Sequence, residues 1–119
     1  MIKKIQSQVP SEPVIMDGVS DTTIQWLYSR TDGAPNFSMR RFVIRPGGRI
    51  GLHEHPWEHE IYFISGKGIA FTDKEKVPVG AGDSIYLPGG EPHGYTNDSL
   101  VDLVFLCMIP NSGDKRPQK

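Results

Sequence analysis

The sequence predicts an all-β chain whose short strands form a sandwich or a barrel. The 119 residues include 13 glycines and 10 prolines, which is many for a helical protein. These turn residues recur between short apolar runs rich in Val, Ile, Phe and Tyr, a pattern typical of a many-stranded sheet. No window shows a sustained 3.6-residue periodicity, so we expect no helix beyond one turn near the N-terminus.

The expected elements follow one another along a single domain, because 119 residues suffice for one hydrophobic core. Residues 1–20 should form an N-terminal arm that lies along the barrel or along a partner. Residues 21–110 form the barrel domain, and residues 111–119 form a flexible polar tail. Strand composition is found, in chain order, at residues 22–28, 37–45, 49–55, 61–71 (two strands), 83–87 and 100–109.

Turn residues set the ends of these strands. The Pro-Gly-Gly sequence at 46–48 should force a turn between the second and third strands. The Ser-Gly-Lys-Gly sequence at 65–68 should join the next two strands as a hairpin. A second Pro-Gly-Gly sequence, at 88–90, turns the chain towards His93, and Pro110 ends the last strand.

The bulk properties exclude several classes of protein. The formal net charge is −1 and the sequence pI is about 6.4, so we expect no nucleic-acid partner and no anionic membrane surface. The longest apolar run, 104–109, is far too short to cross a bilayer, and no apolar segment follows the basic start of the chain. The single cysteine, Cys107, excludes an intramolecular disulfide and suits a reducing compartment, so we expect a cytoplasmic protein.

All four histidines fall in two segments bounded by glycine and proline, residues 47–60 and 82–97. Imidazole is a common ligand of transition metals, so this grouping predicts a metal centre. His53 and His55 are two residues apart on an extended segment and therefore point to the same face. A third ligand comes from where the loop returns, where His59 and Glu60 are both candidates, and His93 arrives from a separate strand.

The same two segments resemble the sequence motifs of the cupin family. In the first, Gly47 is followed by five residues and then by His53-Glu54-His55. The second motif is matched without a gap by Gly82, Pro88, Gly90, His93 and Asn97. The resemblance covers nearly the whole chain and implies a double-stranded β-helix, or jelly-roll, barrel with a metal site. It does not identify a substrate, because this fold supports many chemistries.

The third metal ligand departs from the usual family pattern, in which a glutamate is followed after six residues by a glycine. Six residues separate His59 from Gly66, whereas only five separate Glu60 from it. His59 should therefore occupy the position of the glutamate, and Glu60 should point to the opposite face of the strand. The chain then resembles a subgroup of small four-histidine cupins, which implies one divalent transition metal per chain. Manganese is expected, and iron, copper, nickel, cobalt or zinc would also be accepted.

The sequence also suggests what surrounds the metal. Four neutral imidazoles leave the full +2 charge of the ion uncompensated and leave two positions of an octahedral ion open. One face of the last strand should line the lumen, with Phe105, Cys107 and Ile109 as the substrate-binding wall. Arg40 could hold an anionic substrate, and Trp57 should pack as a lid or an anchor. No side chain beyond the metal ligands is assigned a catalytic role.

We expect the first of three functions, and the other two are alternatives. The first is a metal-dependent, dioxygenase-like oxidoreductase that acts on a small apolar organic substrate, and an apolar pocket would favour it. The second is a non-redox isomerase or lyase that uses the metal as a Lewis acid, and two or more buried ionisable groups beside the metal would favour it. The third is a small-molecule or metal-binding module without catalysis. We also expect a homodimer, because a small open barrel exposes sheet edges that a partner can cover.

Overall fold

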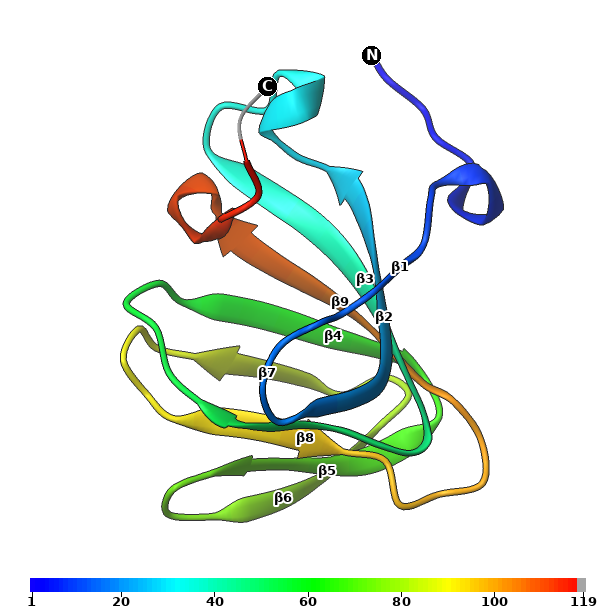
Figure 1. The fold of residues 1–119 in the computed structure, drawn as a ribbon, viewed down its shortest axis with the longest axis vertical. Coiled ribbons are helices and arrows are strands. Elements are labelled where there is room, and N and C mark those ends of the chain that lie inside the picture. Colours follow the sequence, from blue (N-terminus) through cyan, green and yellow to red (C-terminus); the bar gives the residue numbers. More distant parts are fainter. Residues whose placement is uncertain (118–119) are drawn as a thin grey trace.

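In the computed structural model, which describes residues 1–117, nine strands form one continuous hydrogen-bonded sheet that curls round a central core (Figure 1). The described residues contain no α-helix, only three single turns of 3-10 helix, so the predicted all-β class is confirmed. The strands are β1 (Glu12–Pro13), β2 (Val19–Tyr28), β3 (Phe37–His53), β4 (His59–Ser65), β5 (Lys67–Thr72), β6 (Lys76–Gly80), β7 (Ser84–Leu87), β8 (His93–Thr96) and β9 (Leu103–Pro110). The 3-10 turns are η1 (Gln6–Gln8), η2 (Arg30–Asp32) and η3 (Asn111–Gly113).

The long strand β3 connects the two halves of the jelly-roll barrel. The sheet order is β6-β5-β8-β3-β9-β4-β7, with β2 on β3 and β1 on β2, and every pair is antiparallel. The first half of β3 pairs with β9 from Phe37 to Ile44, and its last part pairs with β8 from Arg49 to His53. Residues far apart in the sequence, such as His53 and His93, therefore become direct neighbours across the ladder.

The predicted turn at 46–48 does not end the strand, because β3 runs through it. Gly47 adopts a positive φ of 81°, a conformation that glycine reaches without a steric penalty, and its N–H donates to the Asn97 carbonyl at 2.8 Å. The Asn97 N–H in turn donates to the Gly48 carbonyl at 3.0 Å. The glycines therefore bend β3 where its partner changes from β9 to β8, and the bend keeps its hydrogen bonds.

The predicted hairpin across residues 65–68 is wrong. Strand β4 pairs with β7 and β9, whereas β5 pairs with β6 and β8, so the chain crosses from one half of the barrel to the other between them. Gly66 makes this crossing with a φ of 82°, and a Cβ added there would collide with the carbonyl oxygen of Asp102. The local turn residues were recognised correctly, but long-range pairing decides which strands they join.

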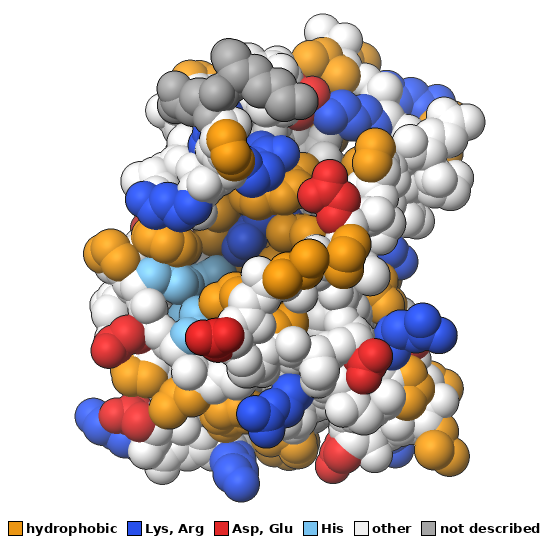
Figure 2. Space-filling view, viewed as in Figure 1, with side chains coloured by type: hydrophobic (Ala, Val, Ile, Leu, Met, Phe, Trp, Pro, Cys, Tyr) orange, Lys and Arg blue, Asp and Glu red, His pale blue; other side chains and the backbone are white. Residues whose placement is uncertain are grey.

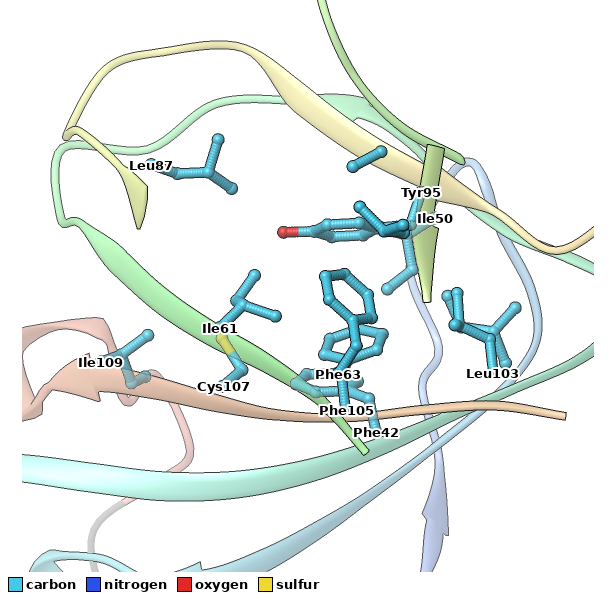
Figure 3. Packing of buried hydrophobic residues seen from close by; sticks show 13 residues of the cluster. Phe42, Ile50, Ile61, Phe63, Leu87, Tyr95, Leu103, Phe105, Cys107 and Ile109 are labelled. Atoms are coloured by element: carbon cyan, nitrogen blue, oxygen red, sulfur yellow. The ribbon is translucent and has the colours of Figure 1, made fainter. Parts of the chain in front are cut away.

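The core lies between the two halves of the sheet and is built round stacked aromatic rings (Figure 3). Phe42 and Phe105 stack with their ring centroids 5.2 Å apart, and Phe63 lies 5.3 Å from Phe105. From Phe105 onward, strand β9 buries alternate residues, as its sequence parity predicts, and Val104 on the other face is buried as well. The buried face includes Leu103, Phe105, Cys107 and Ile109.

Both ends of the chain pack against the barrel. At the N-terminal end, β1 pairs with β2, and Val14 and Val19 pack against the core. At the other end, Asp114 is 6% exposed and forms ion pairs with Arg30 and Arg116, so residues 111–117 differ from the predicted tail. Residues 118–119, the rest of that predicted tail, lie outside the described residues. Among the described residues, no helix is long and apolar enough to span a membrane.

Candidate metal centre

The four histidines meet inside one end of the barrel, where strand β3 ends and strands β4 and β8 begin. His53 is the last residue of β3 and lies opposite His93, the first residue of β8. His55 lies in the following loop, and His59 begins β4 where that loop returns. The ring centroids of His53 and His93 are 4.4 Å apart, those of His55 and His59 4.6 Å, and those of His59 and His93 4.9 Å.

Three of the rings are held by hydrogen bonds through Nδ1. The Nδ1–H groups of His53, His55 and His93 donate to backbone carbonyl oxygens at 2.9, 2.9 and 2.8 Å, those of Gly51, Trp57 and Glu91 respectively. A carbonyl oxygen can only accept, so in each neutral ring the lone pair is at Nε2. This is the arrangement in which metal-bound histidines are normally oriented by the protein.

The free Nε2 atoms suit a metal ion. One ligand nitrogen from each of His53, His55 and His93 lies within 4.8 Å of the others. The Nε2 atom of His93 is buried and has no hydrogen-bond partner among the described residues. A buried lone pair without a donor is unfavourable unless a cation occupies the space in front of it, so these residues fit a divalent transition metal.

His59 adjoins this three-histidine group. Its side chain is 7% exposed and faces the interior, whereas Glu60 is exposed, as the motif register predicts. Its Nε2 lies 2.7 Å from Nε2 of His55, and its Nδ1 lies 2.8 Å from Sγ of Cys107. Two ring nitrogens at this distance require a proton or a metal ion beside them. The ligand nitrogens that all lie within 4.8 Å of one another are those of His53, His55 and His93. Coordination of the metal by His59 is therefore a prediction.

Burial keeps these imidazoles neutral. Desolvation lowers the pKa of His59 to about 2, with a further contribution from the positive charge of Arg40. Desolvation also lowers the pKa of His93 to about 4, and it lowers the pKa of His55. The neutral form is the one that binds metals, so the site is ready for a metal at neutral pH.

The histidines form one side of a cavity of about 210 Å³. Figure 2 shows this hollow as a group of hydrophobic side chains with histidines at one margin and a basic side chain in its depth. Arg40 is the basic residue among those that line it. The apolar part of the wall consists of Val14, Met16, Val19, Ile24, Phe42, Ile50, Trp57 and Phe105. Val14, Met16 and Val19 belong to the N-terminal segment, which sequence reasoning did not place at the site.

The predicted substrate wall is found in part at this cavity. Phe105, Cys107 and Arg40 line it, whereas Ile109 does not. Ile109 is 2% exposed within the core cluster and pairs with Ser38, two residues further along β9 from the histidines than Cys107. Side-chain parity places it on the correct face, but its position along the strand takes it past the cavity.

Three polar side chains besides the histidines lie in this apolar surrounding. Arg40 is 9% exposed, and its Nη2 donates to Sγ of Cys107 at 2.9 Å. Burial raises the pKa of the Cys107 thiol, so the sulfur is protonated at neutral pH. The hydroxyl group of Tyr95 is buried without a hydrogen-bond partner in the described structure, and in Figure 3 it points towards the side of the barrel where Leu87 and Cys107 lie.

Tyr95 was missed by sequence reasoning, although a signal was present. It follows His93 by two residues on β8, so strand parity turns both side chains to the same face. Its burial raises the pKa of the hydroxyl well above the ordinary value. The group is therefore a neutral hydrogen-bond donor at the edge of the metal site.

Trp57 anchors the loop between the metal ligands. Its ring stacks on that of His55 with centroids 4.1 Å apart and an angle of 5° between the planes. The amino group of Lys115 lies 5.2 Å from the Trp57 ring, and the ring also packs against Gly113. The segment after β9 therefore supports the orientation of a metal-site histidine.

Comparison with known proteins agrees with this geometry. A family model described as "Cupin domain" matches residues 40–109. The chain is 40% identical over 70 residues to an oxalate-binding protein of Thermotoga maritima, covering 58% of each chain. It is 30% identical over 77 residues to a 1-methylthio-D-xylulose 5-phosphate methylsulfurylase of Rhodospirillum rubrum, covering 65% of this chain and 49% of the relative. The alignments thus span about half to three-fifths of the length of these curated relatives.

Solved structures extend the likeness to the whole chain. A polyketide cyclase from Streptomyces resistomycificus superposes with a TM-score of 0.88 and 33% identity, covering 99% of this chain and 83% of that chain. A predicted oxalate decarboxylase from Thermotoga maritima gives a TM-score of 0.81 and 29% identity, covering 92% and 98%.

Proposed function

The chain belongs to the cupin family, and from that premise we propose that it is a metal-dependent, non-redox enzyme that acts on a small oxygen-bearing organic compound. One observation carries the choice of chemistry. Arg40, Tyr95 and Cys107 are all buried and line the same cavity as the metal-site histidines. Several ionisable groups beside the metal favour Lewis-acid catalysis over activation of oxygen in an apolar pocket.

His53, His55 and His93 would hold the ion, with His59 as the fourth ligand and manganese as the expected metal. When bound, a divalent ion polarises a carbonyl or hydroxyl oxygen of the substrate as a Lewis acid. The backbone carbonyls that accept from the Nδ1–H groups fix the ring orientations in advance, so little reorganisation accompanies binding.

The remaining polar groups stabilise negative charge on substrate oxygen. The guanidinium group of Arg40 donates hydrogen bonds from the side of the cavity that β3 and β9 form. The hydroxyl of Tyr95 donates from β8. Donors that are fixed before the reaction in a site of low water content stabilise developing charge more strongly than water does. Ile24, Ile50 and Phe105 exclude water and contact the apolar part of the substrate.

Likeness to the polyketide cyclase supports ring closure as the reaction class. Ring closure within a molecule that carries several carbonyl groups needs polarisation of one carbonyl and stabilisation of an enolate oxygen. It needs no external oxidant. The two oxygen-binding features of the cavity, the histidine cluster and Arg40 with Tyr95, suit a substrate with two neighbouring oxygen functions.

A dioxygenase-like activity is the second candidate. It is favoured by the apolar composition of the rest of the wall, which would protect oxygen intermediates from water. It requires a redox-active ion, whereas Lewis-acid chemistry does not.

Metal replacement separates the candidates. Metal-free protein would be loaded with zinc, manganese, iron or copper and incubated with aromatic polyketide-type compounds, with and without oxygen. We expect the zinc form to be active without oxygen, because no electron transfer is involved. Activity confined to redox-active ions and accompanied by oxygen consumption would establish the oxygenase instead. Tight ligand binding without turnover by any metal form would indicate a binding module.

A further inference from the structure

We propose that Arg40 forms an anion-binding subsite and that the ligand of this cavity is a small organic anion with an apolar body. The oxyanion of the ligand, a carboxylate or an ionised enol, would bind to the guanidinium group. This inference deepens the proposed function, on which it depends for the reaction but not for binding.

The first support is the lack of a negative partner for Arg40. The side chain is 9% exposed, and in the described part of the chain no carboxylate forms an ion pair with it. Its Nη2 donates to the sulfur of Cys107, which is a weak acceptor, and lies 3.5 Å from Nδ1 of His59. Its Nε is buried and has no hydrogen-bond partner among the described residues. A buried charge without a counter-charge is costly, and proteins keep such groups where a ligand supplies the missing charge.

The second support is the chemistry of the cavity wall. Of the described residues, those that line it include Arg40 and the four histidines but no aspartate or glutamate. The carboxylates nearest in sequence to the ligand histidines, Glu54, Glu58 and Glu60, are exposed. The cavity is therefore positive in character even before a divalent cation is added.

The geometry of the guanidinium group suits an oxyanion. It is planar, and its donors can bind two oxygen atoms of one carboxylate side by side. Aromatic rings hold it in place, since Cζ lies 5.0 Å from the Phe42 ring centroid and 5.4 Å from that of Trp26. These contacts fix the position of the charge without neutralising it. Tyr95 provides the same cavity with a second donor that has no partner within residues 1–117.

The size and lining of the cavity determine the rest of the ligand. A volume of about 210 Å³ lies below the roughly 300–1,000 Å³ of sites for drug-sized molecules. Ile24, Phe42 and Phe105 offer an apolar surface beside the charge. An inorganic anion would leave this surface uncovered, and a neutral apolar compound would leave Arg40 unpaired. An aromatic or short aliphatic carboxylate would both pair with Arg40 and cover the apolar surface.

The test measures binding of benzoate to the full chain, both metal-free and zinc-loaded, by isothermal titration calorimetry. Benzyl alcohol and inorganic phosphate are the comparison probes, the first without charge and the second without an apolar body. The variant Arg40→Met removes the charge and retains an apolar stem. Arg45→Met is the matched control, because Arg45 lies on the same strand but is exposed.

We expect benzoate to bind the metal-free wild type and to lose about 10- to 100-fold in affinity in Arg40→Met, the usual range for a hydrogen bond to a charged group. Arg45→Met should bind benzoate like the wild type, and both comparison probes should bind more weakly than benzoate. Equal affinity of wild type and Arg40→Met for benzoate would overturn the subsite. Phosphate or benzyl alcohol binding as tightly as benzoate would overturn the ligand class.

A second variant covers the case in which Arg40→Met does not fold. Arg40→Lys keeps the charge but loses the planar pair of donors. Benzoate should raise the thermal unfolding temperature of the wild type more than that of Arg40→Lys. An equal increase in both would count against the guanidinium group as the binding element. Failure of the metal-free protein to bind benzoate would contradict the anion-binding subsite. Inactivity of the zinc-loaded protein would contradict only the proposed function, so the two failures are distinguishable.

Discussion

Two arginine sites lie close to Trp26, one partly exposed and one buried, and only the first contains a carboxylate. Arg116 lies 3.7 Å over the Trp26 ring and binds Asp114 at 2.7 Å, and Arg30 binds the same carboxylate at 3.1 Å. Arg40 lies 5.4 Å from the same ring and has no acidic partner in the described residues. We call the first the closed cluster (Arg30, Asp114 and Arg116) and the second the open site (Arg40 and its cavity).

The difference indicates different roles. In the closed cluster both guanidinium groups have an acidic partner, the shared Asp114 carboxylate, and the cluster ties the segment after β9 to the turn η2, so its role is structural. Burial acts to raise the pKa of Asp114. The hydrogen bonds and the charge of Arg116 nevertheless hold this pKa below its usual range. The open site leaves hydrogen-bond donors unsatisfied beside a cavity. Unsatisfied buried polar groups are uncommon in native proteins, and they concentrate where function requires them.

The largest expected effect concerns the metal side of the open site. His93→Ala should lower metal affinity by more than the roughly 10- to 100-fold that follows loss of a hydrogen-bond partner of a ligand. Elemental analysis after dialysis against a weak chelator measures the metal content that each variant retains. His59→Ala should also reduce metal content, whereas Glu60→Gln should retain it, because Glu60 faces outward. An empty site in Glu60→Gln with a full one in His59→Ala would refute the assignment of His59.

The next effect concerns the closed cluster. Asp114→Asn should reduce the free energy of unfolding by about 2–3 kcal/mol, because it leaves two cations unpaired. The expected loss of unfolding free energy is smaller than that for a fully buried ion pair, because the side chains of Arg30 and Arg116 are 21% and 31% exposed. Denaturant unfolding measures it.

Arg40→Met provides the contrast in the same experiment. It should reduce the unfolding free energy by less than about 1 kcal/mol, because the charge that it removes has no acidic partner among the described residues. A loss as large as that of Asp114→Asn would show that Arg40 has a structural counter-charge, and the distinction between the two sites would fail.

In the metal-free protein, acid should begin to destabilise the open site at a higher pH than the closed cluster. His93 and His59 have pKa values lowered from 6.5 to about 4 and about 2, so the unfolded state binds more protons below pH 6.5. Stability from the open site is therefore present above pH 6.5 and declines as the pH falls from 6.5 through 4 towards 2. The Asp114 pKa is lowered from 3.8, so its stabilisation is present above that pH and is lost only below it.

Urea unfolding of the metal-free protein between pH 3 and 8 would separate these ranges. Asp114→Asn should keep the decline between pH 6.5 and 4 and lose the additional decline below 3.8. A wild-type stability that is constant from pH 7 to 4 would contradict the neutral, buried state of the histidines.

The smallest effect distinguishes the cavity wall from the core. Ile109→Val should cost about 0.5–1.5 kcal/mol of stability, because it removes a buried methylene group, and should leave benzoate binding unchanged. Phe105→Leu should weaken benzoate binding as well, because Phe105 lines the cavity. Calorimetry with benzoate checks both variants. Weaker binding in Ile109→Val would place Ile109 at the ligand after all.

The sequence by itself determined those features that depend on local order. Turn residues between short apolar runs predict the all-β class, and the resemblance of the two glycine-histidine segments to the cupin motifs implies the cupin fold. Strand parity predicts that His59 faces inward, that Glu60 faces outward, and that Phe105 and Cys107 share the buried face. These side-chain orientations follow from the alternation of side chains along an extended chain, which needs no knowledge of neighbouring strands.

Only the tertiary structure decided which strands are neighbours and which buried groups are satisfied. The turn at Gly66 leads across the barrel instead of into a hairpin, and the bend at Gly47 continues β3. Pairing between distant strands brings Tyr95, Arg40 and the N-terminal segment to the histidines. It also gives Arg116 a carboxylate and leaves Arg40 without one, because a counter-charge is a matter of distance in space and side-chain periodicity carries no such information.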